Sequence, residues 1–286
     1  MKLSDLKIGH TAITWPDSEV ETAVQTISEL GFRGVEVFGW TLKTLKEQNR
    51  LNIFEKHGIP LVSSYFSLNI IDPAKKDESM AKMISWLEIL RDMDCHIAAT
   101  GGDSIDRRGY NYFDHKDYIV STVNEYAKVM ADYGVACCFH QHTATPVESF
   151  SETVDFMNSV NTEYVKFGPD VGQLYKGGSD PMVIFKEIVH DFIEVIQHVH
   201  LKDYDGVPLR HDENGREIDS SGFACYTPLG QGVVDLPSIL KFLAEHDYSG
   251  MVNVELDGGP VVPIPQREAL TISKNYLLSV GCTFAK

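Results

Sequence analysis

The sequence has few basic residues for its length and no apolar run long enough to span a membrane. Lys and Arg number 25 against 41 Asp and Glu, so the formal net charge is −16. Duplex DNA and anionic membranes are bound through basic patches, and we therefore expect neither as a partner. Residues 1–10 contain no long apolar stretch, so we expect neither a signal peptide nor a membrane span.

The five cysteines lack the paired spacing of disulfide frameworks and of zinc ribbons. Cys137 and Cys138 are adjacent within an apolar run, and the other three are far apart in the chain. Unpaired thiols are typical of a reducing compartment, so we expect a cytoplasmic protein. No cysteine has an evident base nearby in the sequence, which disfavours thiol catalysis.

Glycine-rich phosphate loops are also absent. Neither G-x-G-x-x-G nor G-x-x-x-x-G-K-S/T occurs, which disfavours a doubly wound nucleotide-binding sheet. The chain instead alternates short apolar runs with amphipathic stretches. The apolar runs with strand character lie at 8–13, 34–38, 60–65, 96–100, 135–142, 165–170, 195–202 and 251–257. Helical patterns include 19–30, 80–93, 118–133, 181–190 and 236–245.

Eight strand candidates in 286 residues, each followed by a helical or connecting stretch, predict an α/β fold. Their number and spacing are those of a (β/α)8 TIM barrel, which we expect to form a single domain over residues 1–286. One long segment, at about 204–232, is rich in glycine, proline and charge. Loops of this length within a domain usually carry function, so we expect it to contribute to binding.

Polar residues occupy one face of several predicted strands, because side chains alternate between the two faces. Val199 and Leu201 share one face of the strand at 195–202, and polar residues share the other. The polar set comprises Glu36, His140, His142, Asp170, His198, His200, Lys202, Asn253, Glu255 and Asp257. The carboxyl ends of barrel strands meet at one mouth, where catalysis occurs in this architecture. The pattern therefore predicts a shared site.

Several buried carboxylates and imidazoles destabilise a fold unless they are paired or bind a cation. Asp170, His200 and Glu255, together with a histidine of the fifth strand, predict a divalent metal site. A mixed oxygen and nitrogen donor set without cysteine suits Mn, Co, Mg or Zn.

The motifs at these strand ends resemble those of a known superfamily. Pro-Asp-Val-Gly-Gln at 169–173, His-Val-His-Leu-Lys-Asp at 198–203 and Val-Asn-Val-Glu-Leu-Asp at 252–257 resemble the xylose-isomerase-like TIM-barrel superfamily. His-Gln-His at 140–142 with Thr145 and Glu148, and the later segment 226–232, are most similar to its inosose dehydratase family. The resemblance covers nearly the whole chain.

The resemblance implies a metal held from the ends of strands five to eight. Asp170, His200 and Glu255 match the Asp, His and second Glu of that ligand set. The first Glu falls on His140, so either His140 or, two residues on, His142 is implied as the fourth ligand. Gln173 stands where many relatives have a histidine. The family resemblance also implies Mn or Co as the favoured metal.

The implied activity is that of a hydro-lyase in inositol catabolism, which removes water from 2-keto-myo-inositol (scyllo-inosose) to give a dione. A keto-sugar isomerase or epimerase with the same metal site is the alternative. Epimerases of this superfamily resemble two-base enzymes, in which two metal-bound glutamates exchange protons with the substrate. A histidine at position 140, where the first of these glutamates would stand, is less compatible with that mechanism. A non-catalytic sugar-binding barrel remains as a third interpretation, and the net charge of −16 disfavours a related endonuclease.

Roles follow for individual residues. Glu255 is the first candidate for the base that removes a proton beside the ketone, with His142 as the alternative. A histidine protonates the departing hydroxyl, and Lys202 stabilises the enediolate unless it forms a buried ion pair with Asp203 or Glu36. For substrate binding we predict Glu36, Trp15 and Arg210. The expected partner is a small keto-polyol or keto-sugar substrate. The sequence is compatible with a homo-oligomer.

Overall fold

The computed structural model describes residues 1–189, 193–208, 210–211, 217–218, 222–259 and 261–285. Its centre is an eight-stranded parallel sheet in the order β6-β5-β4-β3-β2-β1-β12-β7. The strands are β1 (Lys7–Thr11), β2 (Val35–Phe38), β3 (Leu61–Leu68), β4 (Ile97–Gly102), β5 (Ala136–Phe139), β6 (Val165–Phe167), β7 (His198–Leu201) and β12 (Met251–Val254). Isolated bridges at Phe167–Ile196 and Asp170–His200 join the two ends of the sheet, so the barrel is nearly closed.

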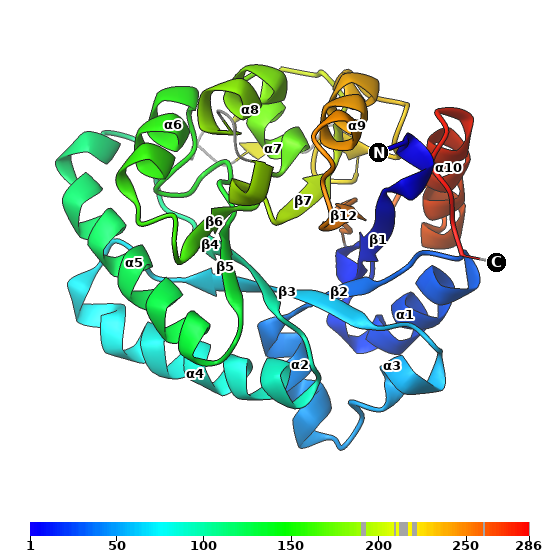
Figure 1. The fold of residues 1–286 in the computed structure, drawn as a ribbon, viewed down its shortest axis with the longest axis horizontal. Coiled ribbons are helices and arrows are strands. Elements are labelled where there is room, and N and C mark those ends of the chain that lie inside the picture. Colours follow the sequence, from blue (N-terminus) through cyan, green and yellow to red (C-terminus); the bar gives the residue numbers. More distant parts are fainter. Residues whose placement is uncertain (190–192, 209, 212–216, 219–221, 260, 286) are drawn as a thin grey trace.

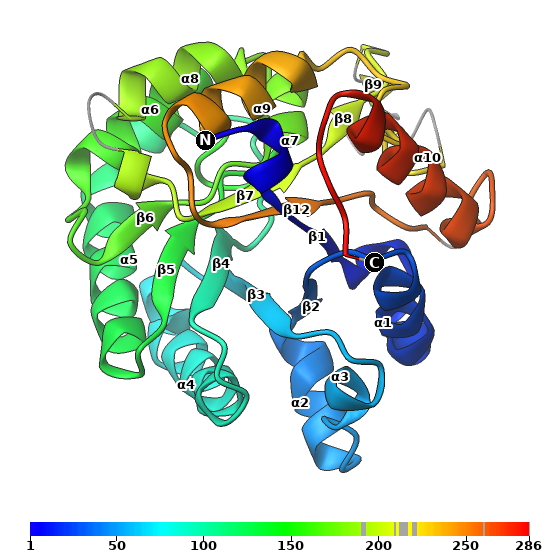
Figure 2. The ribbon, with the colours of Figure 1, turned by 45° about the vertical axis from the view of Figure 1, so that its right-hand side comes forward.

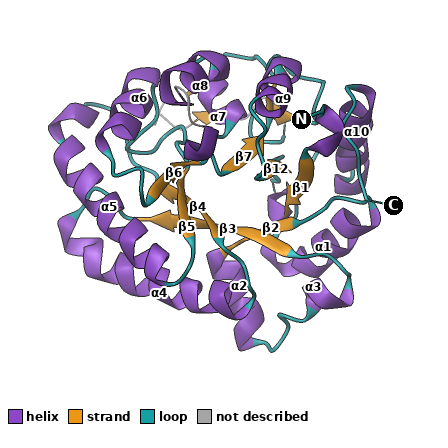
Figure 3. Cartoon of the chain, viewed as in Figure 1, coloured by secondary structure: helices purple, strands orange, loops and turns teal. Residues whose placement is uncertain are grey.

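Helices surround the strands on the outside of the barrel (Figures 1 to 3). They are α1 (Val20–Glu29), α2 (Gly39–Glu47), α3 (Ile53–Lys56), α4 (Lys76–Asp92), α5 (Lys116–Asp132), α6 (Phe150–Ser159), α7 (Val171–Lys176), α8 (Pro181–Val189), α9 (Leu236–Glu245) and α10 (Gln266–Ser279). Short 3-10 turns occur at Leu3–Asp5, Ala12–Thr14, Asp17–Glu19, Pro73–Lys75, Tyr112–Asp114 and Ile193–Val195.

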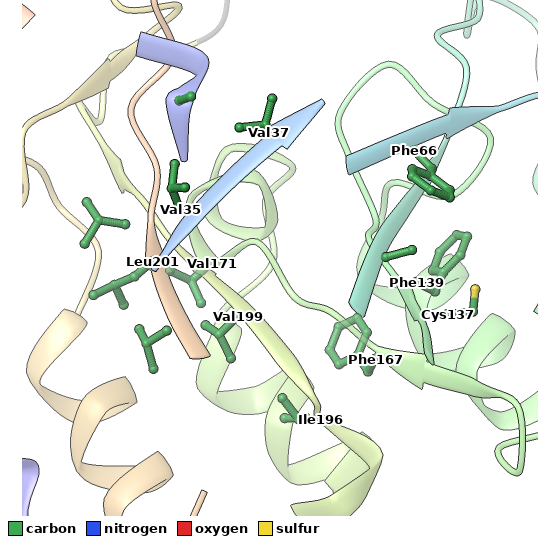
Figure 4. Packing of buried hydrophobic residues seen from close by; sticks show 14 of the residues in the cluster. Val35, Val37, Phe66, Cys137, Phe139, Phe167, Val171, Ile196, Val199 and Leu201 are labelled. Carbon is green, nitrogen blue, oxygen red and sulfur yellow. The ribbon is translucent and has the colours of Figure 1, made fainter. Parts of the chain in front are cut away.

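The apolar face of each strand packs against this helix layer. In β7, Val199 and Leu201 are fully buried among other aliphatic side chains (Figure 4). Helix α1 contributes the buried residues Ala23, Val24 and Ile27 to the apolar core between helices and strands. These residues have the three- and four-residue spacing of an amphipathic helix. The opposite strand face, with its polar residues, is thereby directed into the barrel.

The predicted fold class is confirmed, because each of the eight predicted strands overlaps a strand of the barrel. One difference that affects the site is at 135–142, where the ladder ends at Phe139 and residues 140–142 continue as irregular backbone. The predicted helix at 181–190 is described as far as Val189, since His190 lies outside the described residues.

The segment predicted as a long loop contains four two-residue strands. They are β8 (Asp203–Tyr204), β9 (Arg210–His211), β10 (Glu217–Ile218) and β11 (Tyr226–Thr227). They form two antiparallel pairs, β8 with β11 and β9 with β10. Residues 209, 212–216 and 219–221 of this segment lie outside the described part of the chain.

None of the helices in the described ranges combines the length and the apolar character that crossing a bilayer would require.

Candidate active site

The polar residues predicted from strand parity meet at the carboxyl ends of β5, β6, β7 and β12. Asp170 lies three residues after the last residue of β6 and caps α7, since its Oδ1 accepts the backbone N–H of Gln173 at 2.9 Å. The cap turns the chain sharply after the strand and leaves Oδ2 directed into the barrel, 3.3 Å from Lys202 Nζ. A bridge between Asp170 and His200 sets β6 and β7 in register at this level.

Three of the predicted metal ligands form a compact cluster. His140, Asp170 and His200 are fully buried and offer ligand atoms that all lie within 4.8 Å of one another. Glu255 Oε2 lies 2.9 Å from His200 Nδ1, so the fourth predicted ligand borders the same point. Strands distant in sequence thus bring two imidazoles and two carboxylates together, which is a donor set suited to a divalent cation.

The two histidines after β5 differ in the partners of their ring nitrogens. His142 Nδ1 lies 2.6 Å from the carbonyl oxygen of Thr143, and its Nε2 lies 2.6 Å from Gln173 Nε2. Both nitrogens of His142 are therefore engaged, one donating and one accepting. His140 Nδ1, by contrast, is buried and has no hydrogen-bond partner among the described residues. The free nitrogen of His140 has the chemistry of an available ligand atom.

Burial lowers the pKa of both histidines, well below the ordinary value in His140. Both rings are therefore neutral near pH 7, which is the form of histidine that binds metal ions. Gln173 supports this state at His142 because its amide can donate to an unprotonated Nε2. Gln173, which stands where many relatives have a histidine, thus fixes the orientation of the neighbouring His142 ring.

Lys202 lies at the centre of the carboxylates, completely buried. Its Nζ is 2.6 Å from Glu255 Oε1, 3.0 Å from Asp257 Oδ1 and 3.3 Å from Asp170 Oδ2, and it lies over the ring of Tyr226. Burial alone would lower the pKa of this ammonium group, but the carboxylates, Asp170 foremost, hold it well above the usual value. The side chain is therefore a fixed positive charge.

The predicted ion pair of Lys202 with Asp203 or Glu36 is wrong. The carboxylate of Asp203 accepts the backbone N–H groups of Gly230, Gly232 and Val234 at 2.9 to 3.1 Å. Asp203 directly follows Lys202, and consecutive residues of a strand point to opposite faces. Asp203 consequently anchors the segment after β11, whereas Lys202 points into the barrel.

Glu36, the second residue of β2, lies beneath the histidines of β7. Its Oε1 is 2.8 Å from His200 Nε2, and its Oε2 is 2.9 Å from His198 Nε2 and accepts the Ser63 hydroxyl at 2.6 Å. Burial would raise the pKa of Glu36, but the two imidazoles hold it well below the ordinary value. Glu36 reaches the cavity wall, yet both oxygens have protein partners, which favours a role in orienting His200 over direct substrate binding.

A cavity of about 400 Å³ opens above this cluster. Its walls include the predicted residues Glu36, Trp15, His140, His142 and Glu255. Arg210, also predicted to bind substrate, has a described backbone in β9, but its side chain lies outside the described part of the structure.

Sequence reasoning placed Asp257 on the polar strand face without assigning it a role, and it missed two aromatic side chains at the site. Asp257 shares the strand face of Glu255, and the structure makes it an ion-pair partner of Lys202. Tyr65, within β3, has its ring 5.3 Å from that of His140, and Tyr226 lies beneath the Lys202 ammonium group. Aromatic residues occur throughout the core, so no sequence pattern distinguished these two.

The fold and the polar cluster place the chain among TIM-barrel proteins with a site at the strand ends. The chain belongs to the xylose isomerase-like TIM barrel family, whose family model matches residues 24–276. This confirms the superfamily resemblance. Along 98% of its length the chain is 26% identical to an inosose dehydratase of Histophilus somni, covering 99% of that protein, and other relatives carry the same name.

Two solved structures share the fold closely. One is the probable 3-DHS dehydratase AsbF of Bacillus anthracis, with a TM-score of 0.76, 17% identity and coverage of 96% of this chain and 99% of that one. The other is the IolI protein with a bound zinc atom, with a TM-score of 0.76, 18% identity and coverage of 96% and 98%. At identities of 17% and 18%, the structural similarity establishes a common fold and no more.

Proposed function

We propose that the protein is a metal-dependent hydro-lyase that removes water from a cyclic keto-polyol, with scyllo-inosose as the first candidate substrate and a dione as the product. The observation that carries the proposal is the cluster of His140, Asp170 and His200 beside Glu255, at the floor of a cavity. Full-length similarity to inosose dehydratases supports the same reaction.

The residues present are suited to a divalent cation. Four carboxylates (Glu36, Asp170, Glu255 and Asp257) contact Lys202 or the β7 histidines, and His140 Nδ1 has no partner in the described structure. We assign His140, Asp170, His200 and Glu255 as the ligands. A bound divalent ion would polarise the substrate carbonyl and acidify the neighbouring C–H. Mn or Co is the favoured metal by family resemblance.

Glu255 is the proposed base. Burial would raise its pKa, but His200 and Lys202 hold the pKa well below the ordinary value, so the carboxylate is ionised at neutral pH. An ionised carboxylate at the cavity wall can accept the proton adjacent to the substrate ketone. Lys202 Nζ, 2.6 Å from Glu255 Oε1, supplies positive charge where the enolate oxygen develops.

His142 is the less favoured base, because its Nε2 must leave Gln173 before it can accept a substrate proton. We propose that His142 positions a substrate hydroxyl at the cavity wall instead.

The decisive test is metal analysis of the purified protein, followed by incubation with scyllo-inosose and a panel of ketohexoses. We expect about one divalent metal per chain, loss of the mass of one water from scyllo-inosose and a product that absorbs in the ultraviolet. A product of unchanged mass would establish the isomerase or epimerase alternative. Metal-free protein with unchanged substrates would favour a non-catalytic sugar-binding barrel.

The same preparation tests the ligand assignment. His140→Ala should lose the metal, because His140 clusters with Asp170 and His200. His142→Ala should retain it, because His142 is not part of that cluster and its ring nitrogens contact Thr143 and Gln173. Metal loss from the His142 variant alone would reverse the assignment.

We also propose a cytoplasmic location, since all five cysteines are free and buried and would stay reduced there.

A further inference from the structure

The cavity has two ends of different chemistry. The end at the strand termini is polar and contains His140, His142, Glu255 and Asp257. The other end is lined chiefly by apolar and aromatic side chains from the segments after β1 and β2, namely Ala12, Ile13, Trp15, Phe38 and Trp40. A compact polyol needs hydrogen-bond partners on most of its surface, and an apolar wall supplies none.

A continuous series of ring contacts joins the two ends. The ring of Tyr65 lies 5.3 Å from that of His140 and 5.7 Å from that of Phe38, edge-on to both. The ring of Phe38 in turn stacks on Trp40 with centroids 4.1 Å apart. Trp40 is therefore three ring contacts away from the candidate metal ligand, at the far end of the same cavity.

The aromatic wall is held in place by the protein itself. Trp40 Nε1 donates to Asp17 Oδ2 at 2.9 Å, and the Thr41 hydroxyl donates to Asp17 Oδ1 at 2.6 Å. Both oxygens of Asp17 thus have partners, although Asp17 borders the cavity. Gly39 permits Trp86 to pack closely behind the wall, since a Cβ at this position would lie 2.5 Å from the Trp86 ring. Trp40 as a whole residue nonetheless remains 37% exposed.

The volume of the cavity exceeds the needs of one small ring. At about 400 Å³ it lies within the range of roughly 300–1,000 Å³ that pockets for drug-sized ligands have. A six-membered polyol at the polar end would leave the aromatic wall uncovered, with an exposed indole that is already fixed in place.

We propose that the aromatic wall is a second subsite, which binds a planar apolar substituent carried by the keto-polyol ring. The substrate class would then be aryl-substituted keto-sugars or keto-cyclitols, with the ring at the polar end and the aryl group against Trp40. This inference rests on the proposed function, because it names the substrate class of the same cavity. The reaction at the ring is unchanged, since the aryl group contributes binding only.

The test is a calorimetric titration of the metal-containing protein, as purified, with phenyl β-D-glucopyranoside and methyl β-D-glucopyranoside. Neither is a ketone, so binding is measured without turnover. We expect the phenyl glycoside to bind at least about tenfold more tightly than the methyl glycoside, as aromatic contact and apolar burial predict. Failure of the proposed dehydratase activity would appear separately, as unchanged scyllo-inosose.

Variants of the wall locate the effect. Trp40→Ala should reduce the preference for the phenyl glycoside to about threefold or less and leave binding of the methyl glycoside unchanged. Trp40→Phe should retain most of the preference, which controls for a folding defect. Phe113→Ala is the matched control, since Phe113 is 54% exposed and does not line the cavity.

Equal affinities of the two glycosides, or no measurable binding of the phenyl glycoside, would overturn the proposal. An equal loss of both affinities in Trp40→Ala would also overturn it, because the polyol ring itself would then be the group that stacks on the indole.

Discussion

The charge state and orientation of individual side chains at this site are set by the groups that they contact. Glu255 contacts His200 through one oxygen and Lys202 through the other, and it also lines the cavity. Few positions combine a buried ionised carboxylate, a neighbouring ammonium group and access to substrate. These contacts make Glu255 the position where a minimal substitution is most informative.

Replacing Glu255 with Gln should abolish turnover of scyllo-inosose and leave the fold intact. The amide removes the negative charge that accepts the proton, and loss of a general base costs about 10²–10⁴-fold in rate. The fold should persist because Lys202 keeps Asp257 at 3.0 Å and Asp170 at 3.3 Å. Steady-state kinetics and circular dichroism check the two statements.

Glu125→Gln is the matched control, since Glu125 is surface-exposed and paired with Lys76 away from the cavity. Activity near wild type in Glu255→Gln would remove Glu255 from the mechanism.

A second residue-level expectation concerns His10 in β1. Complete burial lowers its pKa to about 4. Its Nδ1 lies 2.7 Å from the carbonyl oxygen of Thr11, and its Nε2 has no hydrogen-bond partner among the described residues. The unfolded chain, with an ordinary histidine pKa near 6.5, binds more protons between pH 6.5 and 4. The free energy of unfolding therefore falls as the pH drops through this window, and His10 contributes about 3 kcal/mol of that loss.

His10→Asn should remove this contribution while keeping a side-chain N–H near the Thr11 carbonyl. Denaturant unfolding at pH 7 and pH 4 measures it. We expect the stability difference between wild type and variant to shift by about 3 kcal/mol in favour of the variant at pH 4. Parallel pH dependences of the two proteins would contradict the assignment.

At the scale of elements, the close approach of α7 to β7 sets the position of Asp170. Gly172, in the first turn of α7, faces the aliphatic stem of Lys202, and a Cβ there would lie 2.8 Å from the Cβ and Cγ of Lys202. Those atoms are near the backbone of β7 and cannot easily move. A glycine at this position therefore lets the capping residue Asp170 and Lys202 share one site.

Gly172→Ala should push α7 away from β7, destabilise the protein by about 1–3 kcal/mol and weaken metal affinity by about tenfold or more. Chemical denaturation and competition with a metal chelator measure the two effects. Gly259→Ala is the control, because the nearest atom to its added Cβ lies 3.4 Å away. An unchanged metal affinity in Gly172→Ala would show that the spacing of α7 does not position Asp170.

At the scale of the whole molecule, the barrel is joined least extensively between β6 and β7. Five residue pairs join β3 and β4, whereas isolated bridges at two positions join the segments around β6 and β7. The proposed ligands come from both sides of this junction, Asp170 after β6 and His200 within β7. A bound ion would therefore connect the segments that the backbone joins least.

Removal of the metal with a chelator should accordingly lower the melting temperature. A ligand present at 100 times its Kd stabilises a protein by about 2.7 kcal/mol, or roughly 5–10 °C for a domain of this size. Thermal unfolding with and without added Mn²⁺ measures the shift. Asp170→Asn should show little or no shift, and a wild-type melting temperature independent of metal would contradict the proposed site.

The sequence by itself determined the barrel and the set of polar strand ends. Hydrophobic periodicity and strand parity depend on neighbouring residues, so eight strands and the inward direction of His200, Lys202 and Glu255 could be read directly. The motif at 198–203 identified the family for the same reason, because its residues are contiguous.

Only the tertiary structure decided which contacts each of these side chains makes, and therefore which role each is assigned. The engaged ring of His142 depends on Gln173, 31 residues further along the chain, whereas His140 Nδ1 has no partner in the described structure. The ion-pair partners of Lys202 come from two other strand ends, those of β6 and β12, and the aromatic wall comes from the segments after β1 and β2. Hydrogen bonds and ring contacts act over a few ångströms, so partners far apart in the chain emerge only when the barrel closes.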